Sequence, residues 1–469
     1  MSTAARKSVF LILGLESTHI LLSIIEIKGN CLDQVKLKVP HQWAREGHVE
    51  FNPHDLVSLI KTGINHLIQK HMVSVHAIGI VSTGFSAMAW HKDTGATLGY
   101  AVGNIKNAEG IRHVQRSVLQ ESIAKSSGLY QWESATFLAW DWLLRNIPEV
   151  QLAKKNKTLL LGTMESWLLF NLSGKNAFKT DITHALRTGL FNMSEQAWDK
   201  FLIREFGIET CMLPQVHPSS FHYAVTQGFM PLPDDIEIGA ISFQTQAELL
   251  GNFGSQYGQC QLSWFDQKME LLVNTGEVQG AKGQTCTLLS SDRMTRYGLV
   301  QPIYLPIWPK KILGEMPDLP VSGQAQHHHV YMRRREERGV NSAWDWINLT
   351  DDMDIQDLYF SYHKSIAFFI KEQLFHLEKQ LGFYFKELLV DPHISVALLQ
   401  LYSDICELPF VLVRQHSCSA WGAWVLLCLR SESLKLNLIS KYRIYKRVLP
   451  SLDPISTVAL YQEWRDKIR

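Results

Sequence analysis

The sequence has little net charge and no long apolar run. Its 46 Lys and Arg residues nearly balance 45 Asp and Glu residues, which leaves a formal net charge of +1. No global basic field therefore argues for a nucleic-acid partner, and we expect none. No stretch reaches the roughly 18–20 consecutive apolar residues that cross a bilayer, so we expect no membrane span. Residues 9–15 are apolar but end at Glu16 without a small-residue cleavage site, which predicts a strand rather than a signal peptide.

Cysteine is scarce and its spacing is irregular. The seven cysteines are odd in number and include no C-x-x-C pair. This pattern favours reduced, buried structural thiols and a cytoplasmic location. The cysteines are Cys31, Cys211, Cys260, Cys286, Cys406, Cys418 and Cys428.

Internal repeats are also absent, and one stretch departs from regular patterning. Residues 326–338 contain three consecutive histidines followed by an arginine-rich run with glutamates between the arginines. No acidic or cysteine partners stand there at metal-ligand spacing, so we predict a solvated loop or helix face and no confident metal site. A metal-binding or nucleic-acid-binding role for this stretch is the alternative interpretation.

The composition is that of a soluble globular protein with a sizeable core. Apolar residues make up 46% of the chain and charged residues 19%. A length of 469 residues is too great for one compact domain of ordinary size, and it fits two.

Predicted strands and helices alternate along the chain. Continuous apolar runs predict strands, and apolar positions at helical spacing predict helices. This alternation predicts an α/β protein with a boundary near residues 231–235, which gives domains 1–235 and 236–469. The predicted strands are residues 9–15, 19–27, 75–82, 159–161, 236–241, 261–264 and 270–273, and the predicted helices are residues 55–70, 134–145, 165–172, 244–250 and 357–381.

Several segments carry extended motifs in a fixed order. Residues 47–53 read G-H-V-E-F-N-P, residues 162–174 read G-T-M-E-S-W-L-L-F-N-L-S-G, and residues 180–192 read T-D-I-T-H-A-L-R-T-G-L-F-N. These segments resemble the motifs G-W-V-E-x-D-P, G-T-x-D-T-W-L-x-x-x-L-T-G and T-D-x-x-N-A-S-x-T-x-L-F-N of the FGGY carbohydrate kinases, and of glycerol kinases in particular. Matches run in order from residue 10 to residue 429 and cover most of the chain.

The resemblance implies two actin-like (RNase H-like) domains around a central cleft. There the family phosphorylates glycerol to glycerol 3-phosphate with ATP. Such a transfer needs a phosphate cradle, a metal site and a base near the accepting hydroxyl. ATP and Mg²⁺ are implied here by the resemblance alone. It also implies a homo- or hetero-oligomer with glycerol-kinase-like chains.

Both phosphate loops of the resembled family are altered. In its first loop, D-x-G-T-T/S, glycine lets backbone N–H groups approach the phosphate. Here Glu16 keeps a carboxylate that is one methylene longer, Thr18 stands at the glycine and His19 replaces a hydroxyl residue, so we predict an ordinary turn between two strands. The second loop, G-T-G, falls at Asp266, which would repel phosphate, and Lys268, which could reach one only as a point charge.

The segment that carries the family's general base is altered as well. The motif G-D-Q-Q-A-A corresponds to residues 243–248, with Gln244 at the position of the Asp base and Thr245 at a substrate-binding position. An amide cannot accept the hydroxyl proton, and loss of a general base costs about 10²–10⁴ in rate. Glu248 lies one helical turn later and could replace the base, although we expect it to be a solvated helix residue.

The polyol and adenine positions differ too. The family's Arg-Glu pair and Trp correspond to Gly84, Phe85 and Asn104, so the hydrogen-bonding partners of the polyol are lost. The D-G-G turn that lies against adenine corresponds to a turn that keeps Asp391 but has Pro392 in place of glycine.

Five chemical parts are lost together while the strand and helix motifs remain. This combination favours a catalytically impaired pseudokinase of glycerol-kinase type with a binding or regulatory role. One alternative is a divergent but active kinase that uses Glu16, Glu248 and Lys268 in new roles. Another is a polyol or metabolite sensor without turnover, in which Phe85 and Phe243 line a less polar pocket.

Overall fold

The chain divides into two compact units. The first comprises Met1–Phe253, Thr275–Leu299 and Cys418–Lys441, and the second comprises Gly254–Asn274, Val300–Ser417 and Tyr442–Arg469. The units are interleaved along the chain, whereas the sequence predicted one boundary near residues 231–235; that boundary stays a prediction. The computed structural model describes residues 6–16, 19–40, 42–43, 49–83, 87–98, 101–103, 108–115, 118–130, 132, 135–252, 254, 256–264, 268–276, 284–291, 294–304, 331–334, 344–348, 355–390, 394–413, 417–430 and 446–468.

A twisted sheet forms the centre of the first unit. Its strands follow the order β18-β14-β15-β6-β1-β2-β3, with β1 antiparallel to β2 and parallel to β6, and β6 parallel to β15. The mixed arrangement confirms the α/β class and the strands predicted at residues 9–15, 19–27 and 75–82. The bounds are β1 Lys7–Leu15, β2 His19–Glu26, β3 Cys31–Lys38, β6 Val73–Ser82, β14 Ser220–Val225, β15 Glu237–Phe243 and β18 Gln284–Ser291.

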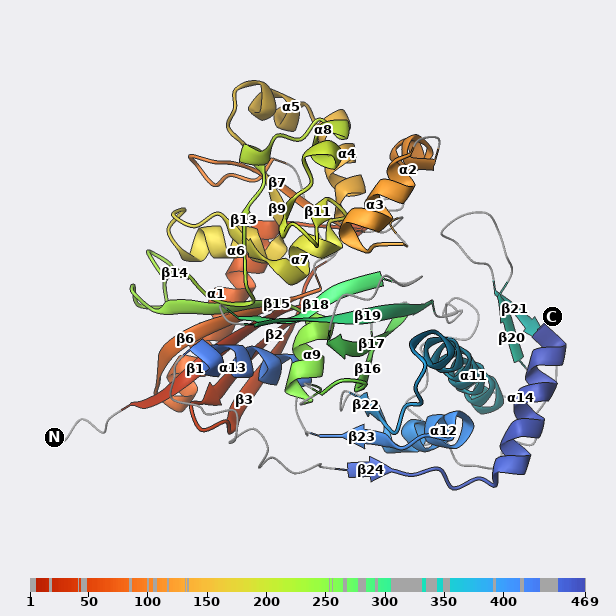
Figure 1. Cartoon of the computed structure of the whole chain (residues 1–469). Helices are drawn as coiled ribbons and strands as arrows, with labels where there is room; N and C mark the ends of the chain where they lie inside the picture. Colours follow the sequence, from red (N-terminus) through yellow and green to blue (C-terminus); the bar gives the residue numbers. More distant parts are fainter. Residues whose placement is uncertain are drawn as a thin grey trace. The chain divides into compact units, whose positions relative to one another are not determined.

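Helices α1 (Pro53–His71) and α13 (Cys418–Arg430) cover opposite faces of this sheet (Figure 1). Alternation along β6 explains the two faces, because Ile78 and Ile80 belong to the core under α1 while Gly79 faces Ala423 of α13. Helix α1 confirms the helix predicted at residues 55–70. It starts at Asn52, whose side chain accepts a hydrogen bond from the backbone N–H of His54.

A second, five-stranded sheet of the first unit has the order β4-β5-β8-β7-β9. Its last strand, β9, leads directly into α6, and the short strand β10 leads into α7, so two helix starts follow two strand ends. The bounds are β4 Gln42–Trp43, β5 Val49–Phe51, β7 Ala87–His91, β8 Ala101–Gly103, β9 Leu159–Thr163, β10 Lys179–Asp181, β11 Phe191–Asn192, β12 Ala197–Trp198, β13 Gln215–His217, α2 Ala108–Gln115, α3 Leu119–Ser127, α4 Thr136–Asn146, α5 Pro148–Lys155, α6 Met164–Leu172, α7 Ile182–Arg187, α8 Lys200–Glu205 and α9 Gln244–Gly251.

In the second unit the strands follow the order β24-β23-β22-β16-β17, and the long helix α11 (Ile355–Leu381) packs against α12. Helix α11 confirms the helix predicted at residues 357–381. Within the part of the chain that the structure describes, no helix is long and apolar enough to cross a membrane. The remaining bounds are β16 Cys260–Trp264, β17 Lys268–Gly276, β19 Met294–Tyr304, β20 Tyr331–Arg334, β21 Trp344–Ile347, β22 Leu388–Val390, α12 Val396–Cys406, β23 Phe410–Leu412, β24 Lys446–Val448 and α14 Pro454–Ile468.

Candidate functional site

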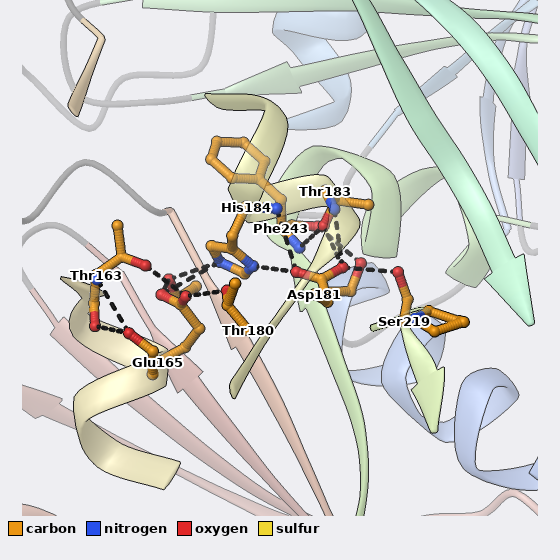
Figure 2. A network of polar contacts seen from close by, with 12 residues as sticks. Thr163, Glu165, Thr180, Asp181, Thr183, His184, Ser219 and Phe243 are labelled. Atoms are coloured by element: carbon orange, nitrogen blue, oxygen red, sulfur yellow. Dashed lines mark hydrogen bonds and ion pairs between the residues drawn. The ribbon is translucent and has the colours of Figure 1, made fainter. Parts of the chain in front are cut away.

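Polar side chains from several elements meet in the interior of the first unit (Figure 2). They come from the two helix starts after β9 and β10 and from the ends of β6 and β15, with Ser219 just before β14. We call this set the buried network. Its members are Ser82, Thr163, Glu165, Thr180, Asp181, Thr183, His184, Ser219 and Phe243.

Asp181 is the N-cap of α7 and accepts hydrogen bonds on both carboxylate oxygens. Its Oδ2 accepts from the Thr183 backbone N–H at 3.1 Å, from Thr183 Oγ1 at 2.6 Å and from Ser219 Oγ at 2.7 Å. Its Oδ1 accepts from the His184 backbone N–H at 3.1 Å and lies 2.5 Å from His184 Nδ1. A buried carboxylate is tolerated when donors surround it in this way, and the helix N-terminus adds further stabilisation.

Glu165 is a second buried carboxylate, in the first turn of α6. Its Oε1 accepts from Thr163 Oγ1 at 2.5 Å and from Thr180 Oγ1 at 2.9 Å. Its Oε2 accepts from Ser82 Oγ at 3.5 Å, so one carboxylate joins the ends of β9, β10 and β6.

The imidazole of His184 lies between these two carboxylates. Its Nδ1 faces Asp181, while its Nε2 lies 3.0 Å from Ser82 Oγ and 3.6 Å from Glu165 Oε2. Burial lowers the pKa of His184, but the nearby charges of Glu165 and then Asp181 outweigh burial and raise it above its ordinary value. These charges favour the protonated form of the ring, in which Nδ1 faces Asp181 and Nε2 faces Ser82.

The order Ser82, His184 and Asp181 has the hydrogen-bond distances of a nucleophile–base–carboxylate triad. A triad needs a neutral imidazole that can take the serine proton. Here a second carboxylate, Glu165, accepts the hydrogen bond of the serine hydroxyl and favours the protonated imidazole. The serine hydroxyl is thus directed at a carboxylate, which differs from the geometry of a triad.

Phe243 closes the network at the end of β15. It is paired in register with Ser82 of β6, and its backbone N–H donates to Thr183 Oγ1 at 2.8 Å. Its fully buried ring lies 5.6 Å from the His184 ring and 4.5 Å from the Arg187 guanidinium, measured to the ring centroid. The ring packs in the interior of the unit instead of facing an open surface.

The predicted base position follows immediately. Gln244 is the first residue of α9, and its Nε2 donates to Glu248 Oε1 at 2.7 Å. The prediction that Glu248 is solvated is wrong: it is 3% exposed, because the face of α9 that carries it packs inside the unit. Thr245 is also buried.

The predicted first phosphate loop lies between β1 and β2. The backbone N–H of Glu16 donates to the carbonyl oxygen of His19 at 2.9 Å, and Leu15 pairs with Ile20 in the antiparallel register. This backbone N–H is thus used in closing a turn between two strands.

The structure describes only a few of the remaining predicted residues. Lys268 is the first residue of β17, and its side chain lies outside the described part of the chain. The other predicted site residues outside the described ranges are Thr18, Gly84, Phe85, Asn104, Asp266, Asp391 and Pro392, together with most of residues 326–338.

Sequence reasoning did not identify the buried network as a site. Glu165 and His184 entered only as part of matching motifs. The available signal was that both depart from those motifs, which have Asp and Asn at these two positions. Among the described residues, no group of three or more His, Cys, Asp or Glu side chains could hold a metal ion.

Comparisons with known proteins agree with the motifs. Residues 10–232 match the N-terminal domain of the FGGY family of carbohydrate kinases. The chain is 25% identical over 488 residues to a glycerol kinase of Carboxydothermus hydrogenoformans, covering 98% of this chain and 97% of that protein. It is also 25% identical over 492 residues to a glycerol kinase of Listeria monocytogenes, covering 99% of this chain and 98% of that protein.

Solved structures show the same fold. The crystal structure of Plasmodium falciparum glycerol kinase with ADP superposes with a TM-score of 0.85 at 19% identity, covering 99% of this chain and 98% of that chain. A sugar kinase from Brucella ovis, described as a xyloylose kinase, superposes with a TM-score of 0.81 at 15% identity, covering 98% of each chain. These likenesses confirm the expected actin-like fold.

Proposed function

We propose that this chain is a glycerol kinase-like protein impaired in phosphoryl transfer, with a binding or regulatory role. The starting point is that residues 10–232 belong to the FGGY family of carbohydrate kinases. The observation that carries the proposal is the amide at the base position. Gln244 begins α9 where the motif has its Asp, and the amide is fixed by its hydrogen bond to Glu248. An amide has no site for the proton of an accepting hydroxyl, so the step loses about 10²–10⁴ in rate.

The buried network supports the same proposal. Its two carboxylates, Glu165 and Asp181, already accept hydrogen bonds from hydroxyl groups and flank His184. Transfer to a hydroxyl needs a proton acceptor. Buried carboxylates engaged in this way do not replace the base that is missing at Gln244.

ATP and Mg²⁺ are implied by the resemblance alone, and the proposed role requires neither. Mg²⁺ is usually held by one or two carboxylates together with the substrate phosphates. Of the carboxylates predicted at the family's ATP and Mg²⁺ positions, Glu16 lies within the described part of the chain, where its backbone N–H donates to the carbonyl oxygen of His19.

Calorimetric titration of the full-length protein with MgATP tests the proposal. The protein concentration must be high enough to detect millimolar affinity. We expect no saturating heat at millimolar ATP. A saturating binding curve would contradict the proposal and would make glycerol and related polyols the next ligands to test.

One observation favours a second candidate, a divergent but active kinase. The carboxylate of Glu248 is buried and reaches the side chain at the base position, 2.7 Å from Gln244 Nε2. Rotation of Gln244 would allow that carboxylate to accept a proton. Under this alternative, Glu248→Gln abolishes the transfer of phosphate to glycerol, while Gln244→Ala retains it.

A role without turnover needs a partner. We propose association with glycerol-kinase-like chains, either copies of this chain or an active relative, in the cytoplasm. The proposal is supported by the alignment of nearly the whole chain with glycerol kinases. Light scattering of the protein, alone and mixed with an active glycerol kinase, tests it, and a monomer in both samples would contradict it.

A further inference from the structure

Three residues that differ from the resembled motifs lie in contact inside the first unit. Glu165 and His184 stand where the motifs have Asp and Asn, and Phe243 stands where the base segment begins with Gly. His184 Nε2 lies 3.6 Å from Glu165 Oε2, and the ring centroids of His184 and Phe243 lie 5.6 Å apart. Changes that are far apart in the sequence therefore meet at one imidazole (Figure 2).

We propose that Glu165 and His184 replace the Asp and Asn of the motifs as a pair, because each residue stabilises the other. His184 is then a positioning residue, whose ring ties the ends of β6 and β15 to α6 and α7. The chain's own charges then order these strand ends without a bound ligand. The inference goes beyond the proposed function, because it would hold equally for an active kinase.

The geometry explains why each residue needs the other. Glu165 is anchored by Thr163 and Thr180 through Oε1, which leaves Oε2 facing His184. Shortening Glu165 to Asp would withdraw the carboxylate by about 1.5 Å, the length of one carbon–carbon bond. An Asn at position 184 could not take up the proton that the two flanking carboxylates favour. Changing one residue alone therefore leaves a buried charge poorly paired, which is the costly case.

The same ring reaches both strand ends. Ser82 is the last residue of β6, and its Oγ lies 3.0 Å from His184 Nε2. Phe243 is the last residue of β15, and its ring packs against the His184 ring. These two residues are partners in the parallel register. The chain continues from them into Thr83 and Gln244, so a displaced His184 ring would shift the start of the base segment.

Within the described part of the chain, the groups around His184 come from several elements. Two carboxylates flank the imidazole. The Tyr223 phenol stays neutral, because burial first, and then Asp181 and Glu165, raise its pKa well above the ordinary value. The Arg187 guanidinium lies over the Phe243 ring, 4.5 Å from its centroid. The facing groups are Glu165 of α6, Asp181 at the start of α7, Arg187 of α7, Ser82 of β6, Tyr223 of β14 and Phe243 of β15.

A double-mutant cycle on the full chain tests the coupling. The variants are Glu165→Asp, His184→Asn and the combination of both, and the thermal unfolding midpoint is measured at pH 6. We expect each single substitution to lower the midpoint by roughly 5 °C or more. The double variant should recover most of that loss. Losses that simply add in the double variant, or single variants as stable as the wild type, would overturn the proposal.

The pH profile separates positioning by charge from mere packing. The pKa of His184 is raised on folding, so its contribution to stability is fully present below the unfolded value of about 6.5. It is lost as the pH rises through the folded pKa. The midpoint of the wild type should therefore fall with rising pH more steeply than that of the double variant. Parallel profiles would overturn the proposal even if a single variant failed to fold.

His363→Asn is the matched control. His363 is also a buried histidine, in the second unit, but burial lowers its pKa to about 3, so it is neutral. Its Nδ1 lies 2.6 Å from the phenol oxygen of Tyr402. Combined with Glu165→Asp, this substitution should give additive losses, and on its own it should leave the pH slope above about pH 6.5 as in the wild type. Unfolding is measured throughout, so failure of this proposal leaves the nucleotide-binding test of function unaffected.

Discussion

At the scale of single residues, burial of charge depends on how many donors surround each group. Glu165 and Asp181 are both buried, and each accepts hydrogen bonds from hydroxyl groups that are themselves buried. The hydroxyls of Thr180 and Ser219 thus have a larger effect on stability than their size suggests. Removing one such donor leaves a carboxylate oxygen without its hydrogen bond, so the cost of burying that charge is no longer compensated.

The substitution Thr180→Val tests the contribution of one hydroxyl group to stability. Valine has nearly the shape of threonine but cannot donate to Glu165 Oε1, which accepts from Thr180 at 2.9 Å. We expect the free energy of unfolding to fall by about 1–3 kcal/mol in urea titrations. The matched control is Thr62→Val on α1, whose exposed hydroxyl donates to the carbonyl oxygen of Ser58; its effect should stay within about 0.5 kcal/mol. Equal effects of the two substitutions would contradict the expectation.

Lys364 gives a second prediction at the residue scale. It is 4% exposed and lies 4.8 Å from the centroid of the Tyr331 ring. Burial lowers its pKa to about 8, against the smaller opposing effect of Glu463. The folded state thus binds this proton more weakly than the unfolded state, so charging Lys364 destabilises the fold fully below pH 8. That penalty disappears as the pH rises toward 10.5, the ordinary value.

Lys364→Met should therefore stabilise the protein at pH 7, by on the order of 1–3 kcal/mol, and have a smaller effect at pH 10. Urea unfolding at the two pH values measures both. Lys61→Met is the control, because Lys61 also lies 4.8 Å from a ring centroid, that of Phe229, but remains partly exposed. Its effect at pH 7 should stay within about 0.5 kcal/mol. Destabilisation of Lys364→Met at pH 7 would show that its contacts outweigh its burial.

At the scale of elements, the crossing of α9 and α13 holds the base segment in place. The two helices approach so closely that a Cβ atom on Gly422 would lie 1.9 Å from the backbone oxygen of Ala247, and one on Gly251 would lie 1.8 Å from that of Cys418. Both neighbours are backbone atoms and cannot rotate away. The helix that starts at Gln244 is therefore positioned from its far side by glycine contacts and from its start by the buried network.

Gly422→Ala should force the two helices apart. We expect a loss of on the order of 3 kcal/mol in the free energy of unfolding, measured in urea. The control is Gly239→Ala on β15, where the nearest atom to an added Cβ is the side-chain atom Leu427 Cδ2 at 3.0 Å. A flexible side chain can yield, so the control should lose clearly less. Similar losses for both would show that the close approach is not the cause.

At the scale of the whole molecule, local patterns predicted the elements but could not predict which elements meet. Residues 9–15 and 75–82 are recognisable as strands because their apolar runs are continuous, and residues 55–70 as a helix because their apolar side chains recur at helical spacing. The same patterns do not reveal that α13 packs against strands of the first unit. Packing partners depend on long-range contacts that no local period encodes.

The buried network was unpredictable for the same reason. Ser82, Glu165, His184 and Ser219 come from four separate segments, and polar residues in a sequence are ordinarily placed at the surface. Glu248 shows the error most clearly, since it was expected to be solvated and is buried. The assignment of Gln244 to the base position rests on alignment with a short motif and stays a prediction.

The measurement that tests the central claim most directly is the ATP-dependent formation of glycerol 3-phosphate by the full-length protein with Mg²⁺ and glycerol, detected by mass spectrometry. The wild type and Glu248→Gln are measured beside a heat-denatured sample. The account predicts no product above the denatured sample for either protein. Product from the wild type that Glu248→Gln lowers by about 10² or more would contradict it and identify Glu248 as the base.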